Sequence, residues 1–251
     1  GRTENAQLAM FVHGLVVWEA VRPELDESPV AFAGHSLGQL TALVAAGVLT
    51  LEDGVALSVE RAEATQSAAD ASPGAMAAFL GLDLDTVLAI AEEAGCWVAN
   101  HNAPGQSAVA GTPDTVEQAM DGARDADAKK VVRLEVAGAF HTPMMQPAAD
   151  ALRPALDDLA YSDPAAPVVA NHDGRAHRDG AGWADRLRRH LVEPVRWHDC
   201  SVTLGDLGAE RVVEVGATRL LWPMVKRSVP GIATAGVGDP ADLEQMTAVP
   251  A

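Results

Sequence analysis

Residues 30–41 read Val-Ala-Phe-Ala-Gly-His-Ser-Leu-Gly-Gln-Leu-Thr, and this stretch decides the fold. Its first four residues form a short apolar run, which predicts a buried strand. The segment 39–49 then has a helical pattern. Between them, Gly34, Ser36 and Gly38 match G-x-S-x-G, the pattern of a sharp turn from strand into helix that exposes a nucleophilic serine. We therefore predict a strained Ser36, with glycine on both sides because a Cβ there would clash with neighbouring backbone.

A nucleophilic serine needs a general base, and the chain has eight histidines. His141 is the best candidate, because it lies where a small subdomain returns to the main body and can face a cleft. His101 precedes a turn and stays an alternative, whereas His35 is adjacent to Ser36 and neighbours on such a turn point apart. Three further histidines are expected to be structural or solvated: His13 in an apolar helix, and His172 and His177 in the polar loop 171–182.

The stretch 75–136 has the order β-α-β-β-α-β, which is typical of a ferredoxin-like unit. We interpret residues 74–140 as a small subdomain inserted into a large α/β subdomain, residues 1–73 and 141–251. In the large subdomain strands alternate with helices, which predicts a parallel sheet covered by helices. The tail from Asp239 is expected to be acidic and mobile. The predicted strands are 30–33, 76–80, 97–100, 107–110, 130–136, 167–170 and 211–215; the predicted helices are 6–22, 39–49, 51–70, 83–94, 113–123, 143–160, 183–192, 198–207 and 220–229.

The charge and composition of the chain exclude several classes of function. The 251 residues include 18 Lys+Arg and 35 Asp+Glu, for a formal net charge of −17. Such a surface repels nucleic acid and anionic membranes, so neither is an expected partner. No apolar run is long enough for a membrane span, and residues 1–20 show no signal-peptide pattern. Cys96 and Cys200 are not spaced as metal ligands, so we expect two small buried thiols, no metal site and a cytoplasmic location.

Seven segments in a fixed order carry a resemblance: GHSLGQ at 34–39, PGAMAAFLGL at 73–82, ANHNAPGQSAVAG at 99–111, VAGAFHTPMM at 136–145, EPVRW at 193–197, VVEVGA at 212–217 and LWPMVKRSVPG at 221–231. Together they resemble the malonyl-CoA:acyl-carrier-protein transacylases and the related acyltransferase domains of polyketide synthases. The resemblance covers essentially the whole chain. It implies an α/β-hydrolase-like large subdomain with a parallel sheet and an inserted ferredoxin-like (βαββαβ) small subdomain, in agreement with the division above.

The resemblance assigns the catalytic roles residue by residue. Ser36 matches the nucleophile, which takes the acyl group as an ester, and His141 matches the general base. The family orients this histidine through a backbone carbonyl, here that of His190, where glutamine is usual. The backbone N–H of Leu37 matches one donor of the oxyanion hole.

Three further residues match the family's substrate-binding positions. Arg61 corresponds to the arginine that pairs with the free carboxylate of the substrate, and a planar guanidinium suits a carboxylate well. An ordinary surface charge on a helix is the alternative for Arg61. His35 lies beside the nucleophile, and Asn102 belongs to an Asn-x-Asn segment that begins at Asn100, for which a turn-forming role is the alternative.

Besides His190, the chain departs from the family pattern in three further places. No counterpart of the family's N-terminal Phe-Pro-Gly-Gln-Gly-like loop, which supplies the second oxyanion donor, precedes the first match at residues 5–7. We therefore expect the first strand and this loop to have been left out, or to come from another chain or a neighbouring synthase domain; otherwise a sheet edge would be exposed. Residues 216–218 replace the usual Gly-Pro-Gly, and residues 221–222 replace two small residues.

The resemblance implies ping-pong transfer of a malonyl group from malonyl-CoA, through an ester on Ser36, to the phosphopantetheine thiol of an acyl carrier protein. The partners are then this carrier and a CoA thioester, with no permanently bound cofactor. Three alternatives stay open: an excised polyketide-synthase acyltransferase domain with another extender unit, a serine hydrolase or thioesterase, and a non-enzymatic binding module. A hydrolase would not need Arg61 and would be expected to orient His141 with an acidic side chain.

Overall fold

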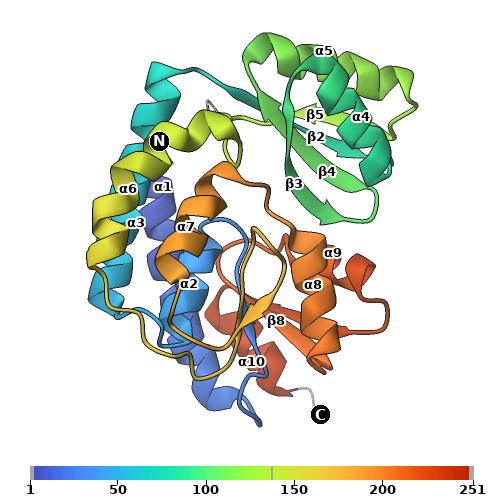
Figure 1. Cartoon of the computed structure of the whole chain (residues 1–251). Helices are drawn as coiled ribbons and strands as arrows, with labels where there is room; N and C mark the ends of the chain where they lie inside the picture. Colours follow the sequence, from blue (N-terminus) through green and yellow to red (C-terminus); the bar gives the residue numbers. More distant parts are fainter. Residues whose placement is uncertain (1–2, 137, 249–251) are drawn as a thin grey trace. The chain divides into compact units, whose positions relative to one another are not determined.

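The computed structural model describes residues 3–136 and 138–248, with side chains for 7–136 and 138–246. Contacts between Cα atoms divide the chain into two compact units (Figure 1). Unit 1 comprises Gly1–Val59, Ala160–Ala181 and Asp199–Ala251, and unit 2 comprises Glu60–Leu159 and Gly182–His198.

Unit 1 contains most of the α/β body. Its helices and strands are α1 (Thr3–Val21), η1 (Arg22–Glu24), β1 (Phe32–Ala33), α2 (Gly38–Ala45), the first part of α3 (Leu51–Ala71), β6 (Val168–Val169), β7 (Ala176–His177), most of α8 (Trp197–Asp206), β8 (Arg211–Val215), α9 (Trp222–Ser228), β9 (Ala233–Val237) and α10 (Pro240–Ala248). β1 and β6 pair in parallel, as do β8 and β9, which confirms the predicted parallel pairing. β7 pairs with β6 in antiparallel orientation and was not among the predicted strands.

The C-terminal region differs from the mobile tail predicted after Asp239. β9 lies beside β8, and α10 follows it. Two carboxylates stabilise this region. Glu214 accepts hydrogen bonds from the N–H groups of residues 220, 221 and 222 at 2.9–3.1 Å and so caps the start of α9. Asp242 pairs with Arg219 and accepts the Gly238 N–H at 2.9 Å, which fixes the turn before α10.

Unit 2 contains a four-stranded sheet with the order β3-β4-β2-β5, antiparallel throughout. The helices α4 and α5 cover one face of this sheet (Figure 1). Both helices start at the caps that their sequences indicate: Asp83 accepts the Thr86 N–H, and Thr112 precedes Pro113. The predicted ferredoxin-like subdomain is therefore confirmed. Its elements are β2 (Ala75–Leu80), α4 (Leu84–Ala94), β3 (Trp97–Ala103), β4 (Gln106–Gly111), α5 (Pro113–Asp125) and β5 (Lys130–Arg133).

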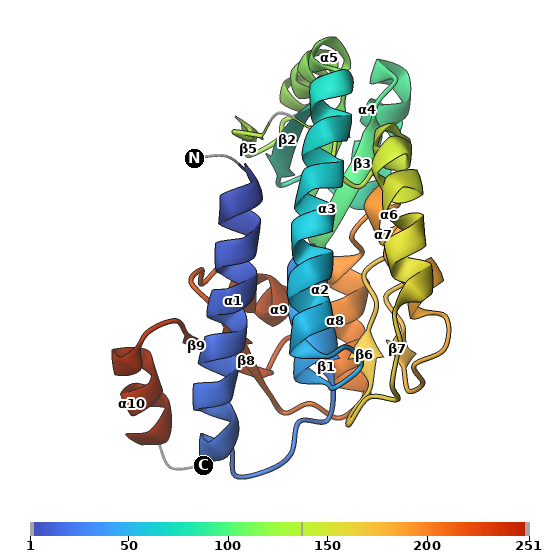
Figure 2. The same ribbon diagram turned by 90° about the vertical axis from the view of Figure 1, so that its left-hand side faces the viewer.

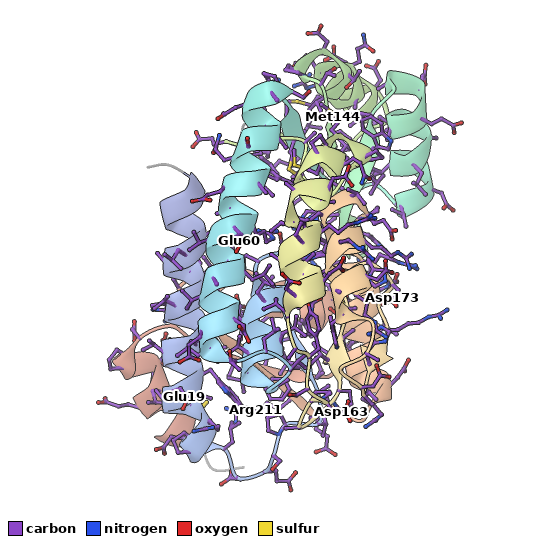
Figure 3. The ribbon with its side chains drawn as sticks, turned by 60° about the vertical axis from the view of Figure 1, so that its left-hand side comes forward. Glu19, Glu60, Met144, Asp163, Asp173 and Arg211 are labelled. Atoms are coloured by element: carbon purple, nitrogen blue, oxygen red, sulfur yellow. The ribbon has the colours of Figure 1, made fainter. Side chains whose placement is uncertain are left out.

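The predicted boundaries of the small subdomain, 74 and 140, do not coincide with those of unit 2. Unit 2 also holds η2 (Pro143–Met145), α6 (Gln146–Asp158) and α7 (Trp183–Val192), and α6 and α7 lie side by side (Figure 2). Two contacts explain the difference. Met144, labelled in Figure 3, packs against a cluster that includes Met76 of β2. The backbone of Val195 pairs with β3, donating to Ala99 and accepting from His101, both at 2.9 Å. Where the domain boundary lies stays a prediction.

None of the helices within the described ranges is long and apolar enough to cross a membrane.

Candidate active site

The turn between β1 and α2 has the geometry that the G-x-S-x-G pattern predicts. β1 ends at Ala33, α2 begins at Gly38, and Ser36 between them has φ +52°. Tight backbone bonds close the turn, from Gly38 N–H to the His35 carbonyl at 2.9 Å and from Gln39 N–H to the Ser36 carbonyl at 3.0 Å. A non-glycine residue with positive φ is strained, so surrounding structure must hold Ser36 there.

The two glycines of the motif have different environments. A Cβ added to Gly34 would lie 1.9 Å from the carbonyl oxygen of Gly38, far inside any real contact. A Cβ added to Gly38 would meet no atom within 4 Å apart from its chain neighbours and the backbone of its own helix. The predicted steric need for glycine is therefore confirmed at Gly34 and wrong at Gly38, where the backbone has open space.

The backbone N–H groups around Ser36 identify the donor available to a ligand. Those of Ser36, Gly38 and Gln39 all have acceptors. Within the part of the chain that the structure describes, the Leu37 N–H has no protein acceptor. It lies at the positive end of α2, so it can stabilise a negative charge that develops next to Ser36. This is the donor that the sequence predicts for the oxyanion hole.

His141 is held in an unusual conformation within unit 2. It has φ +60°, and only three non-glycine residues of the described chain have positive φ: Ser36, Asp127 and His141. Its Nδ1 lies 2.8 Å from the carbonyl oxygen of His190, and its side chain is buried, with 5 % exposure. Because a carbonyl only accepts, Nδ1 carries the proton and Nε2 is the basic nitrogen of the neutral ring.

Arg61 is a buried cation on the part of α3 that belongs to unit 2. Only 8 % of the residue is exposed, and burial lowers the pKa of its guanidinium to about 10. The group is therefore still protonated at neutral pH. Burial contradicts the alternative of an ordinary surface charge, and a desolvated guanidinium is a strong partner for a carboxylate.

The remaining residues that the sequence predicts for the site lie on the turn at Ser36 and on β3. His35 is half-buried on the turn in unit 1, next to Ser36. Asn102 is half-buried and Asn100 is buried, both on β3. His101, the alternative base, lies on β3 with its ring 4.9 Å from that of His198. Unit 1 thus brings together residues 35, 36 and 37, and unit 2 contains residues 61, 102, 141 and 190. In the described residues, no three His, Cys, Asp or Glu side chains are grouped as metal ligands.

The structure also shows a polar residue that the sequence does not mark as functional. Asn171 follows β6 and its amide contacts the turn at Ser36: Oδ1 accepts the Ser36 N–H at 2.8 Å, and Nδ2 donates to the Gly34 carbonyl at 2.8 Å. The sequence signal that could have identified Asn171 is its position directly after a predicted strand, since polar residues at the carboxyl ends of parallel strands gather at one edge of a sheet.

Two histidines of the loop after Asn171 are less exposed to solvent than the sequence predicts. His172 is buried and His177 half-buried, so the expectation that both are solvated is wrong. Their Nε2 atoms lie 3.5 and 3.1 Å from the same carboxylate oxygen of Asp173, which Figure 3 labels. Burial raises the pKa of Asp173. The hydrogen bonds from His177 and the Arg175 N–H, with the two histidine charges, outweigh it and lower the pKa to about 2.

Asp173→Asn is expected to lower the free energy of unfolding at neutral pH by about 1 kcal/mol, a value reduced for solvent screening of a partly exposed group. A lowered pKa in the folded state means stabilisation that is present above the unfolded value of 3.8 and lost as the pH falls toward 2. Urea unfolding of both proteins from pH 7 down to pH 2 should show the difference closing below pH 4. The exposed Asp26→Asn serves as the control, and a difference independent of pH would contradict the ion pairs.

Comparison with known proteins places the chain in a family. The family model described as "Acyl transferase domain" matches residues 1–244. The malonyl CoA-acyl carrier protein transacylase of Bacillus subtilis (strain 168) is 36 % identical over 247 residues, which cover 96 % of this chain and 78 % of that protein. The enzyme of the same name from Mycobacterium tuberculosis (strain H37Rv) is 38 % identical over 228 residues, covering 90 % of this chain and 74 % of that protein.

Solved structures agree with this assignment. The malonyl-CoA:acyl carrier protein transacylase of Xanthomonas oryzae pv. oryzae matches with a TM-score of 0.93 and 37 % identity, covering 98 % of this chain and 80 % of that one. A malonyl-transacylase solved in complex with a type II polyketide-synthase acyl carrier protein matches with a TM-score of 0.92 and 32 % identity. The match covers 97 % of this chain and 80 % of that one. The chain belongs to the acyl transferase domain family.

Proposed function

We propose that this chain transfers a malonyl group from malonyl-CoA to the phosphopantetheine thiol of an acyl carrier protein. The observation that carries the proposal is the strained Ser36 at the start of α2, in a chain 34–38 % identical to proteins named malonyl CoA-acyl carrier protein transacylase. Because the substrate is a CoA thioester and both cysteines are buried thiols rather than a disulfide, we place the reaction in the cytoplasm.

In the first half-reaction, Nε2 of His141 accepts the hydroxyl proton of Ser36, and Oγ attacks the thioester carbonyl carbon. The oxyanion of the tetrahedral intermediate accepts the Leu37 N–H. The C–S bond then breaks, and CoA leaves with the proton that His141 returns. The His190 carbonyl holds the ring in the tautomer that this exchange requires, because it accepts the proton on Nδ1.

In the second half-reaction, the thiol of the carrier's phosphopantetheine gives its proton to His141 and attacks the ester. Ser36 is released when its C–O bond breaks and it recovers a proton from His141. Arg61 binds the malonyl carboxylate in both steps, which favours malonyl over acetyl groups because acetyl offers no carboxylate to the buried guanidinium. His35 and Asn102 are proposed to contact the acyl group or the thioester arm.

The test uses malonyl-CoA radiolabelled in the malonyl group. The chain is mixed with it and separated from free nucleotide, and label retained on the protein is located by peptide mapping. We expect the label on the peptide containing Ser36, and its transfer to a carrier protein that carries phosphopantetheine. The same carrier without phosphopantetheine is the control and should receive none.

Other outcomes identify the competing functions. Rapid release of free malonate, with no labelled carrier, would show a hydrolase. Absence of any label on the chain would contradict both enzymatic functions and favour a binding module. Carriers of fatty-acid and polyketide synthesis should be compared, because one structural relative was solved with a polyketide-synthase carrier. The carrier accepted with the higher kcat/KM then identifies the pathway.

A further inference from the structure

We infer that Asn171 is a positioning residue that holds Ser36 in its reactive conformation by bridging the backbone on both sides of His35. The inference rests on the proposed role of Ser36 as nucleophile. All the residues involved belong to unit 1. Two bonds of the Asn171 amide reach the turn, and a third bond anchors Asn171 itself, because its backbone N–H donates to Oε1 of Gln39 at 2.9 Å.

The position of Asn171 follows from strand pairing. β6 runs parallel to β1 with Ala33 opposite Val169, so the residues that follow both strands emerge at the same edge. After β6 the chain turns tightly, with bonds from Gly174 N–H to the Ala170 carbonyl and from Ala170 N–H to the Arg175 carbonyl, both 2.9 Å. Asn171 is therefore held at the start of a closed turn, directly opposite the turn that presents Ser36.

The bonds constrain the strained backbone. The Gly34 carbonyl belongs to the peptide group before His35, and the Ser36 N–H belongs to the peptide group after it. One planar amide that binds both groups fixes their relative orientation, and so fixes the backbone that enters Ser36. Positive φ at a non-glycine residue persists only where the surroundings determine it in this way.

The same bonds select which N–H remains for the substrate. With the Ser36 N–H committed to Asn171, the Leu37 N–H is the donor that the turn presents to an oxyanion. If the Asn171 amide were removed, the Ser36 N–H would lose this acceptor in a partly buried site and the turn would be able to reorient. The position of Oγ and the direction of the Leu37 N–H would then both vary.

The chemistry of the site requires a group that donates and accepts. Asn171 is fully buried, with 0 % exposure, and its Nδ2 also lies 4.0 Å from the thiol of Cys200. An aspartate has nearly the same shape and still accepts the Ser36 N–H, but it cannot donate to the Gly34 carbonyl when ionised. It would also place an unpaired charge in a buried region. Asparagine is therefore the side chain that can both accept the Ser36 N–H and donate to the Gly34 carbonyl.

The experiment measures single-turnover acylation of the whole chain by malonyl-CoA after rapid mixing. For Asn171→Ala, we expect the acylation rate constant to fall roughly 10- to 100-fold, the range typical of a displaced reacting group. Asn171→Asp should be at least as slow. The concentration of malonyl-CoA that gives half the maximal rate should stay near the wild-type value, and the final amount of acyl-enzyme per folded chain should be unchanged.

Thr203→Val is the matched control. Thr203 donates to the Gly174 carbonyl at 2.6 Å, so this variant also loses a hydrogen bond in the loop after β6 without touching the turn at Ser36. It should lower the melting temperature and leave the acylation rate per folded chain unaltered. If Asn171→Ala does not fold, Gln39→Met, which removes only the anchoring bond to Asn171, should slow acylation roughly threefold.

Two results would overturn the inference: a wild-type rate in the Asn171 variants, or a loss of acyl-enzyme that only follows the loss of folded protein. A fluorophosphonate probe, which needs a reactive serine but no malonyl group, separates this inference from the proposed function. If the wild type reacts with the probe but not with malonyl-CoA, the proposed function is wrong, and the probe rates of the same variants decide the role of Asn171. If it reacts with neither, Ser36 is not a nucleophile and both proposals fail.

Discussion

Replacement of Arg61 with alanine is expected to lower kcat/KM for malonyl-CoA by roughly 100- to 1000-fold, about 3–4 kcal/mol of transition-state binding. The guanidinium is buried and remains charged, since its pKa of about 10 lies well above neutral pH. A carboxylate bound to it is desolvated, so removing the cation leaves that carboxylate unpaired in a poor solvent. Acetyl-CoA has no carboxylate to lose, and its relative kcat/KM should therefore rise by a similar factor.

Two variants control for charge and for general effects. Arg61→Lys keeps a positive charge but loses the planar fork, and we expect roughly a tenfold loss with malonyl-CoA. Arg153→Ala removes an exposed arginine from α6 in the same unit and should leave both substrates unaffected. Melting curves establish that each variant is folded. An unchanged preference for malonyl-CoA in Arg61→Ala would refute the assignment of this residue to the carboxylate.

The turn at Ser36 can be predicted from sequence because its determinants are local. An apolar run, a G-x-S-x-G motif and a helical pattern follow one another within 20 residues. Each predicts the local structure of the residues that form it: a strand, a sharp turn and a helix. The ferredoxin-like unit is predictable for the same reason. Asp83 and Gly95 bound one helix, and Thr112 with Pro113 starts the next, so caps and strand runs identify all six elements.

Asn171 could not be identified in this way, because its partners on the turn lie 132–137 positions earlier in the chain. Only the pairing of β6 with β1 brings them together, and each of these strands has two residues. The same limit explains Asp173. A loop rich in polar residues suggests solvation, whereas here two histidines of the loop share one carboxylate, a relation that depends on how the loop folds.

The C-terminal residues show a different limit. β9 consists of Ala-Thr-Ala-Gly-Val, whose weak apolar character and internal glycine hide a strand that pairs over its whole length with β8. The helix after it depends on Asp242, whose carboxylate binds both the Gly238 N–H and Arg219. In the sequence, the charge of Asp242 suggests a solvated tail. In the folded chain, its carboxylate anchors α10.

Gly34 has no room for a Cβ, whereas Gly38 does, and substitution of Gly34 is therefore expected to have a large effect on both stability and the reactivity of Ser36. Gly34→Ala is expected to destabilise the chain by about 3 kcal/mol or more and to reduce the reaction of Ser36 with a fluorophosphonate probe to near the background. The added Cβ would lie 1.9 and 2.1 Å from the carbonyl oxygen and carbon of Gly38 and 2.8 Å from the nitrogen of Gln39. These are backbone atoms at the start of α2, so no side-chain rotation can relieve the overlap and the helix must move away from Ser36.

Gly38→Ala is the matched control for stability, because it adds the same methyl group four residues away, where nothing beyond its chain neighbours and the backbone of its own helix lies within 4 Å. Alanine is favoured over glycine in a helix, so its melting temperature should equal or exceed that of the wild type. Thermal unfolding of the two variants, measured alongside probe labelling, compares them directly. Equal stability of the two variants would show that the turn can relax around a Cβ at Gly34, and the close approach of backbone that positions Ser36 would then not be required.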